Sequence, residues 1–247
     1  MAEFVHLHNH SHYSLLDGAA RIDQIIDKVS ELGQKSFALT DHGNMFGAVE
    51  FYKSATKAGI KPIIGMEAYV APRAHTEKRT YTEGKRAYHL VLLVKNETGY
   101  RNLLKLTSMA YLDGFYFTPR VDKDLLRKYS EGLVATSACL SGQVTYHAAR
   151  GDYDRAKEQA LEYDEIFGRG NFFLELQRHF TLDGREMEME AIAREVVQKV
   201  SRDTGIPLVA PNDAHYVSAD HHQAHDALIC IGRGKYVSDT KRMKYDT

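Results

Sequence analysis

The chain has 247 residues, of which 43% are hydrophobic and 26% are charged. This composition is ordinary for one large or two small globular domains, and it excludes disordered, collagen-like and coiled-coil proteins. Thirty-two basic and thirty-three acidic residues leave a net charge of −1, so the chain as a whole lacks the positive field of a duplex-binding protein. Any contact with nucleic acid must therefore be local.

The sequence contains no segment that we expect to enter a membrane or direct secretion. No apolar run exceeds five residues, as in Leu90–Val94, whereas a membrane span needs about 20. The amino-terminal residues lack both the basic and the apolar region of a secretory signal. We therefore expect a soluble protein of the cytoplasm.

Histidine is unusually frequent and cysteine is rare. The thirteen histidines include four at positions 6, 8, 10 and 12, and this excess is the first functional signal. A cytoplasmic chain of this size has little use for a disulfide between Cys139 and Cys230. We expect Cys230, in the apolar run 227–231, to be a core residue, and Cys139 to be a free thiol or a metal ligand.

Strands and helices are predicted to alternate along the chain. Short apolar or β-branched runs predict strands at residues 4–8, 36–40, 62–70, 88–94, 132–136, 171–176 and 207–210. Helical periodicity predicts helices at residues 22–32, 46–58, 98–111, 122–129, 152–167, 189–200 and 220–231. Gly33 and Gly205 close the two most regular of these helices.

Alternating strands and helices indicate an α/β fold with a parallel sheet. The length and the number of such units fit a closed (β/α) barrel better than a short open sheet, although a doubly wound sheet stays an alternative. In both architectures the functional residues lie where strands end and the following loops begin. The residues at those junctions are therefore the candidates for a site.

Ligand-type side chains occur at several of these junctions. Alternate residues of an extended segment face one way, about 6 to 7 Å apart, so His8 and His10 can share a metal site. A single pair of this kind is weak evidence in a chain so rich in histidine. The other predicted strand ends carry Asp17, Asp41, His42, Glu67, Cys139, Asp213 and His215. Packing alone does not explain such a convergence.

Imidazole, carboxylate and thiolate groups together suit zinc, manganese or iron better than calcium or a magnesium-only site. Clustered divalent ions can lower the pKa of a bridging water, hold a phosphoryl oxygen and stabilise a leaving oxygen. Hydrolysis is the natural use of such a cluster. The absence of a G-x-S-x-G or P-loop pattern agrees with this interpretation.

Several joined motifs resemble the PHP (polymerase and histidinol phosphatase) domain. These motifs are FVHLHNHS at 4–11, LLDG at 15–18, ALTDHGN at 38–44, GMEAY at 65–69, YHL at 88–90 and NDAHY at 212–216. Residues 114–120 and 139–142 point to the branch that forms the amino-terminal domain of bacterial DNA polymerase III alpha subunits. The resemblance covers nearly the whole chain. It implies one domain over 1–247, a fragment of a larger polymerase subunit, without the polymerase palm.

The resemblance implies a distorted seven-stranded (β/α) barrel with two or three divalent metal ions at the carboxyl ends of the strands. The ions would be zinc, manganese or iron, with magnesium also possible. The implied ligands are His8, His10, Asp17, His42, Glu67, His89, Cys139, Asp213 and His215, of which Asp17, His42, Glu67 and His215 are the expected catalytic residues. His89 begins a predicted strand, which is the wrong end of a parallel strand, and we attribute this conflict to the predicted boundary.

The activity that the resemblance implies is phosphoester hydrolysis by a water held between the metal ions. In the polymerase branch this is a 3′–5′ exonuclease that proofreads a primer end. Its expected partners are single-stranded DNA or the primer 3′ end, the remainder of the polymerase subunit and other replisome subunits. Two alternatives stay open: a non-catalytic domain in which the metal cluster only stabilises the fold, and a small-molecule phosphatase of the histidinol-phosphate type.

A few further residues are candidates for supporting roles. We expect Asp41 to orient metal ligands from outside the cluster. Arg120 is a candidate for binding substrate phosphate, with a surface ion pair as the alternative, and His179 is a second candidate for a substrate contact. The basic loop at 73–86 is predicted to be solvated rather than bound to DNA.

Overall fold

The computed structural model describes residues 4–81, 85–180 and 184–244. Its strands form one seven-stranded sheet in the order β1-β2-β3-β5-β6-β7, with β4 paired to the last residues of β2. The strands are β1 (Ser36–Leu39), β2 (Lys61–Val70), β3 (Tyr88–Val94), β4 (Arg120–Val121), β5 (Leu133–Thr136), β6 (Phe172–Glu175) and β7 (Leu208–Val209). The predicted strand positions from residue 36 onward are therefore confirmed, and only the two-residue β4 was missed.

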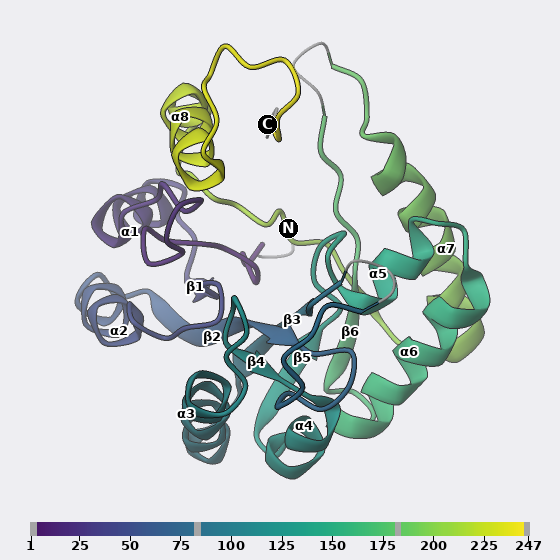
Figure 1. The fold of residues 1–247 in the computed structure, drawn as a ribbon. Helices are drawn as coiled ribbons and strands as arrows, with labels where there is room; N and C mark the ends of the chain where they lie inside the picture. Colours follow the sequence, from purple (N-terminus) through teal and green to yellow (C-terminus); the bar gives the residue numbers. More distant parts are fainter. Residues whose placement is uncertain (1–3, 82–84, 181–183, 245–247) are drawn as a thin grey trace.

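Helices cover the outside of the curled sheet (Figure 1). They are α1 (Ile22–Glu31), α2 (Ala48–Lys57), α3 (Glu97–Leu112), α4 (Lys123–Tyr129), α5 (Gln143–Ala148), α6 (Tyr153–Phe167), α7 (Glu188–Thr204) and α8 (His222–Arg233), with the short 3-10 helix η1 (Ala219–His221) before α8. All seven predicted helices are found, and α5 is additional. No helix among the described residues combines the length and apolar character needed to cross a membrane.

The amino-terminal segment lies between the two ends of this sheet. His6 forms an isolated parallel bridge with Phe37 of β1, and Asn9 forms another with Ala214, beyond β7. The segment accepts backbone hydrogen bonds from Ala38 and Thr40 on one side and donates one to Ala214 on the other, but it forms only single bridges and no ladder of strand length. The prediction of a continuous strand at 4–8 is therefore wrong, although the segment does link β1 to the chain after β7.

The sheet is not wholly parallel, because β3 runs antiparallel to both β2 and β5. No helix occurs in the described parts of the connection from β2 to β3, residues 71–81 and 85–87. A parallel neighbour would require a crossover connection that returns the chain to the opposite end of the sheet. Our expectation of a parallel arrangement is thus wrong for β3, while its predicted boundaries, 88–94, are confirmed.

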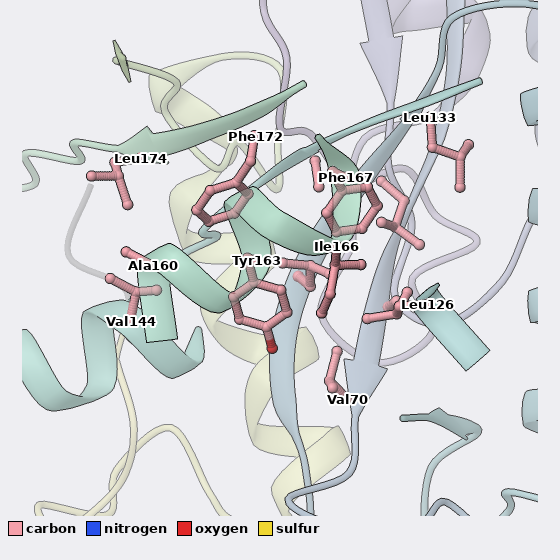
Figure 2. Packing of buried hydrophobic residues seen from close by; sticks show 14 of the residues in the cluster. Val70, Leu126, Leu133, Val144, Ala160, Tyr163, Ile166, Phe167, Phe172 and Leu174 are labelled. Carbon is pink, nitrogen blue, oxygen red and sulfur yellow. The ribbon is translucent and has the colours of Figure 1, made fainter. Parts of the chain in front are cut away.

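The main apolar core lies between the sheet and helices α3 to α7. Tyr163 and Phe172, both almost fully buried, face each other with ring centroids 5.5 Å apart (Figure 2). Helix α6 supplies Ala156, Ala160, Tyr163 and Phe167 at spacings of three and four residues, which place them on one face of the helix. This core fixes β5 and β6, and with them the residues at their carboxyl ends.

Candidate metal centre

Side chains from distant parts of the chain meet at the carboxyl edge of the parallel strands. Their ligand atoms form three overlapping groups, and within each group the atoms lie within 4.8 Å of one another. The groups are His10 with His42 and His215, His8 with His10 and Asp213, and His42 with Glu67 and His89. Since the groups share His10 and His42, they form one continuous cluster rather than separate sites.

Glu67 lies in β2 with only 1% of its surface exposed, and histidines surround its carboxylate. Its Oε1 atom is 3.2 Å from Nε2 of His8 and 2.9 Å from Nδ1 of His89. Its Oε2 atom is 2.5 Å from Nδ1 of His42. Each oxygen of this carboxylate therefore faces a different part of the cluster.

Two aspartates complete the acidic part of the cluster. Asp213 Oδ1 lies 3.2 Å from Nε2 of His8 and 3.0 Å from Nε2 of His10. Asp17 Oδ2 lies 3.0 Å from Nε2 of His42, and its side chain is 30% exposed. Asp213, with its side chain 10% exposed, is therefore the less accessible of the two aspartates.

The direction of β3 explains how His89 reaches the cluster. Because β3 is antiparallel to β2, its first residues lie beside the last residues of β2, and His89 is paired in register with Tyr69. The start of β3 is therefore at the same edge as the carboxyl ends of the parallel strands. The conflict found in the sequence came from the assumed strand direction and not from the predicted boundary.

Cys139 follows β5 and lies at the margin of the cluster. Its Sγ atom is 3.7 Å from Nδ1 of His89 and 3.8 Å from Oε1 of Glu67. Burial and the nearby carboxylate of Glu67 raise the pKa of the Cys139 thiol well above its usual value. Without a nearby cation the thiol is therefore protonated. Cys230, by contrast, is buried among core residues, as predicted.

Hydrogen bonds on the outer sides of the rings fix their orientation. Nδ1 of His8 donates to Oε2 of Glu175 at 3.1 Å, and Nδ1 of His215 donates to the carbonyl oxygen of Asp213 at 2.8 Å. With Nδ1 used as a donor, Nε2 of each ring is left to face the cluster. A carboxylate or carbonyl behind a ligand histidine is the usual arrangement in metal sites.

Asp41 supports His10 through Ser14. The Ser14 hydroxyl donates to Oδ1 of Asp41 at 2.8 Å and accepts from Nδ1 of His10 at 2.9 Å. Asp41 also accepts from the backbone N–H of Ser11 at 2.7 Å and from its hydroxyl at 2.8 Å. Asp41 therefore contacts His10 only through the serine. Burial raises its pKa.

Glu175, the last residue of β6, is the principal residue that our reading of the sequence missed. It is 1% exposed, and it accepts hydrogen bonds from the hydroxyl of Thr136 and, at 3.0 Å, from Nε2 of Gln177, as well as from His8. A signal was present, because an acidic residue at the carboxyl end of a buried strand is the pattern that identified the other candidates.

Unusual backbone conformations occur beside the cluster. Leu16, Ala138 and Asp213 have φ values of 74°, 58° and 53°, in the left-handed region that residues with a side chain rarely adopt. Leu16 precedes Asp17, Ala138 precedes Cys139, and Asp213 is itself a candidate ligand. Such conformations are concentrated at functional sites, where the surrounding structure holds them in place.

The electrostatics of the cluster are dominated by burial and by close opposite charges. Burial opposes the charged form of His42, but the carboxylates of Glu67 and Asp17 outweigh it and raise the pKa of this ring to about 10. Similarly, Asp213 and its neighbouring carboxylates outweigh burial and raise the pKa of His8. The sign of the effect therefore depends on how many carboxylates face each ring.

His10 shows the opposite behaviour. Burial and the adjacent rings of His42 and His215 lower its pKa to about 3. On the acidic side, burial favours protonation, yet the surrounding histidines hold the pKa values of Glu67 and Asp213 well below their usual range. The cluster thus combines ionised carboxylates with a ring that stays neutral, and neutral imidazole and carboxylate are the forms that bind metal ions.

The residues present fit a group of divalent metal ions. Buried polar atoms are expected to have partners, and exceptions call for an explanation. Within the described ranges, six buried atoms of the cluster lack a partner in hydrogen-bonding geometry: Nε2 of His8, Nε2 of His10, Oδ1 of Asp17, Nδ1 of His42, Oε2 of Glu67 and Oδ1 of Asp213. These nitrogen and oxygen atoms are all potential metal ligands, and they lie in one region beside the thiol of Cys139. This set suits zinc, manganese or iron.

A cavity of about 330 Å³ opens onto the cluster. Its lining includes Leu15, Leu16, Asp17, His42, Tyr69, His89, Cys139, Ser141, Asp213, His215, Ile229, Gly232, Arg233 and Met243. His8, His10 and Glu67 are not part of this surface, because they are buried behind the other side chains. A molecule that enters the cavity would therefore meet the cluster from the side of Asp17 and His42.

Arg120 does not take part in the cluster. It is completely buried, and its guanidinium donates to the backbone carbonyls of Gly114, His75, Glu77 and Arg86. The expectation of a phosphate contact is therefore corrected: Arg120 holds together the loop between β2 and β3 and the turn before β4. Residues 82–84 of the basic loop lie outside the described part of the chain.

His179 lies beside the cluster, and both of its ring nitrogens have protein partners. Nδ1 donates to Glu190 at 2.7 Å, and Nε2 donates to the carbonyl oxygen of Asn212 at 2.8 Å. The hydrogen bond to the Glu190 carboxylate is the main reason that the pKa of His179 is raised to about 8. In this arrangement the ring supports the residue before Asp213 and does not point to an open position.

Comparison with known proteins identifies the family of this fold. Residues 6–179 match the sequence model of the PHP domain. The chain belongs to the PHP domain family. It is 51% identical over 246 residues to DNA polymerase III subunit alpha of Borreliella burgdorferi, covering 100% of this chain and 21% of that protein. The corresponding subunit of Treponema pallidum is 48% identical over 244 residues, covering 99% of this chain and 20% of that protein.

This PHP chain therefore spans about a fifth of the length of these curated relatives. Solved structures agree on the fold. A two-domain protein from Bacteroides vulgatus containing a predicted PHP-like metal-dependent phosphoesterase gives a TM-score of 0.51 at 16% identity, over 94% of this chain and 55% of that one. An amidohydrolase from Chromobacterium violaceum gives a TM-score of 0.50 at 15% identity, over 87% of this chain and 88% of that one. The predicted distorted α/β barrel of the PHP type is thus confirmed.

Proposed function

We propose that this PHP chain is a metal-dependent phosphoesterase. The observation that carries the proposal is the set of three overlapping groups of ligand atoms, each within 4.8 Å, at the bottom of an accessible cavity. Buried nitrogen and oxygen atoms without hydrogen bonds in that cluster need a cation to compensate for their burial. Membership of the PHP family supports the same chemistry.

The proposed metal ligands are the nine side chains named from the sequence: His8, His10, Asp17, His42, Glu67, His89, Cys139, Asp213 and His215. Bound divalent ions would lower the pKa of a water molecule and neutralise the oxygens of a phosphoryl group. Glu67 and Asp213 each face two or more histidines, so both carboxylates would hold metal together with these rings. Glu175 and the pair Ser14 and Asp41 keep Nε2 of His8 and His10 available for ligation.

Four of these side chains have proposed catalytic roles. Asp17 and His42 line the cavity, and Oδ1 of Asp17 has no hydrogen-bond partner in the described structure. We assign this oxygen to accept a proton from the attacking water. Glu67 Oε2 lies beside Nδ1 of His42 and orients this ring, and His215 lines the cavity with its ring centroid 5.7 Å from that of His42.

For the substrate, we propose the 3′-terminal phosphodiester of single-stranded DNA or a frayed primer. Water would attack phosphorus, the bond to the 3′ oxygen would break, and a nucleoside monophosphate would leave. The similarity to DNA polymerase III alpha subunits supports this 3′–5′ exonuclease. It also supports the proposed partners, which are the remainder of such a subunit and the replisome. We further propose that residues 1–247 form one PHP domain and that the protein is cytoplasmic, as expected from the sequence.

The test is hydrolysis of a 5′-labelled oligonucleotide in the presence of Mn²⁺ or Zn²⁺. We expect stepwise shortening by the wild-type chain and at least a hundredfold loss in His8→Ala, because replacing a ligand should cost more than the roughly 10- to 100-fold of an outer partner. His221→Ala is the matched control, since His221 lies in η1, away from the cluster. Equal rates in His8→Ala and wild type would refute the proposal.

The same assay separates the two alternatives. If the metal ions only stabilise the fold, EDTA lowers the melting temperature while no preparation hydrolyses any phosphoester. If the protein is a small-molecule phosphatase, the chain cleaves para-nitrophenyl phosphate but leaves the oligonucleotide intact. Activity on the oligonucleotide that disappears on chelation, at metal concentrations where the chain stays folded, supports the exonuclease.

A further inference from the structure

The mouth of the cavity carries one residue whose role is not explained by the metal cluster. Among the described lysine and arginine residues, Arg233 alone lines this cavity. It is the last residue of α8 and is exposed to solvent. The lining also contains the carboxylates of Asp17 and Asp213, and Arg233 brings a permanent positive charge to the rim of the cavity.

Helix α8 is fixed to the loop that carries Asp17. Nε2 of His225 donates to the carbonyl oxygen of Asp17 at 2.8 Å. Gly232 lies so close to Leu16 that a Cβ atom at this position would be 2.9 Å from the Leu16 backbone oxygen. These two contacts hold the end of α8, and therefore Arg233, in a defined position relative to Asp17.

Arg233 lacks the strong partners that other arginines of this region have. Its Nη2 atom is 3.1 Å from Sδ of Met243, and a thioether is only a weak acceptor. No carboxylate in the described ranges lies within ion-pair distance of it. Arg242, nine residues along the chain, instead pairs with Asp226 at 2.7 Å and donates to the carbonyl oxygen of Val237. Arg242 thus folds the chain back on α8, whereas Arg233 keeps its charge available.

We propose that Arg233 binds the non-bridging phosphate oxygens of a nucleotide substrate or product at the mouth of the cavity. A guanidinium can donate two parallel hydrogen bonds to a phosphate, and these are much stronger than its contact with a thioether. The phosphate oxygens would replace Sδ of Met243 as the acceptor. This inference rests on the proposed phosphoesterase function, because it assigns a substrate contact to the same cavity.

The test measures binding as well as turnover. Thymidine 5′-monophosphate is titrated calorimetrically into Zn²⁺-loaded wild type, Arg233→Gln, Arg233→Lys and Arg202→Gln. Arg202 is an exposed arginine near the end of α7 and serves as the matched control. We expect Arg233→Gln to weaken binding by about tenfold or more, Arg233→Lys to weaken it less, and Arg202→Gln to bind as wild type does.

The zinc content and melting temperature of each variant are measured first, because Arg233 is exposed and its replacement should change neither. Unchanged binding in Arg233→Gln overturns the inference, and so does a wild-type chain that binds no nucleotide. If binding depends on Arg233 but no preparation hydrolyses DNA or para-nitrophenyl phosphate, the proposed function fails and the inference stands. If the enzyme is active, Arg233→Gln should raise KM more than it lowers kcat.

Discussion

The apolar core behind the sheet and the inner part of the polar cluster, around His8 and Glu67, are equally buried, but their atoms are compensated in different ways. Phe172 and Leu174 of β6 are 0% exposed and pack against helices, so their burial itself stabilises the fold. His8 and Glu67 are 0% and 1% exposed, and each has a buried polar atom without a hydrogen bond. The comparison shows that β6 and its neighbours are stabilised by their own packing, whereas the polar atoms of the cluster need the cation that we propose for this site.

The largest effect on this comparison should come from opening the core. Phe172→Ala removes a ring that packs against Tyr163 and leaves a cavity, which typically costs about 3–5 kcal/mol of unfolding free energy. Urea denaturation measures this loss. Leu112→Ala, at a side chain that is 79% exposed, is the control and should change stability by less than about 0.5 kcal/mol. A small effect of Phe172→Ala would show that β6 does not depend on this core.

Removing metal should have the next largest effect. A ligand that binds only the folded state stabilises it by about 2.7 kcal/mol at a hundred times its dissociation constant, so EDTA should lower the unfolding free energy by a similar amount. Denaturation with and without Zn²⁺ measures the difference. The same experiment on His8→Ala should show a much smaller response. Equal stability of wild type in EDTA and in Zn²⁺ would contradict the view that the cluster depends on a cation.

A substitution behind the cluster should weaken metal binding without unfolding the protein. In Glu175→Gln a neutral amide replaces the carboxylate that accepts hydrogen bonds from His8, Thr136 and Gln177. We expect the basicity of His8 to fall and its ring to be held less firmly in orientation. Losing such an outer partner typically costs 10- to 100-fold in metal affinity, which competition with a chelating dye can measure. Glu188→Gln, at the exposed start of α7, is the control. Unchanged affinity in Glu175→Gln would mean that His8 needs no support.

The smallest effect concerns His179, at the border of the two regions. Its pKa is raised to about 8 from an ordinary value of 6.5, mainly by the hydrogen bond to Glu190. The hydrogen bond between His179 and Glu190 therefore contributes its full amount to the free energy of unfolding below pH 6.5. This contribution is lost as the pH rises through 8. The loss is at most about 2 kcal/mol. Urea denaturation at pH 6 and pH 9 should show that the unfolding free energy falls more steeply in wild type than in His179→Gln. An equal fall in both proteins would contradict the predicted contribution of His179.

Much of the fold was accessible from the sequence because local patterns carry it. Strand β3 was predicted with its observed bounds, since its apolar run is flanked by clear breaks. The direction of β3 was not predictable in this way. It depends on how the chain returns between β2 and β3, and residues 71–87 carry no periodicity that shows where this connection leads. A two-residue strand such as β4 is likewise too short to leave a pattern.

The candidate site could be predicted where its residues follow strands, and less well elsewhere. Asp213 was found because it follows a predicted strand, and Glu67 because it lies within a predicted strand towards the same edge of the sheet. The partners of Arg120 could not be found, because they are backbone carbonyls, which every residue possesses. Arg233 was equally hidden, since its place at the cavity depends on the packing of Gly232 against Leu16.

The reversed course of β3 has a consequence for how such a protein can diversify. Since β2 finishes and β3 starts at the same edge, both ends of the intervening stretch 71–87 are anchored next to Tyr69 and His89, which border the cavity. We therefore expect insertions or deletions within that stretch to leave the paired strands, and with them Glu67 and His89, in register. The length of this connection can thus vary without moving the edge of the sheet that borders the cavity.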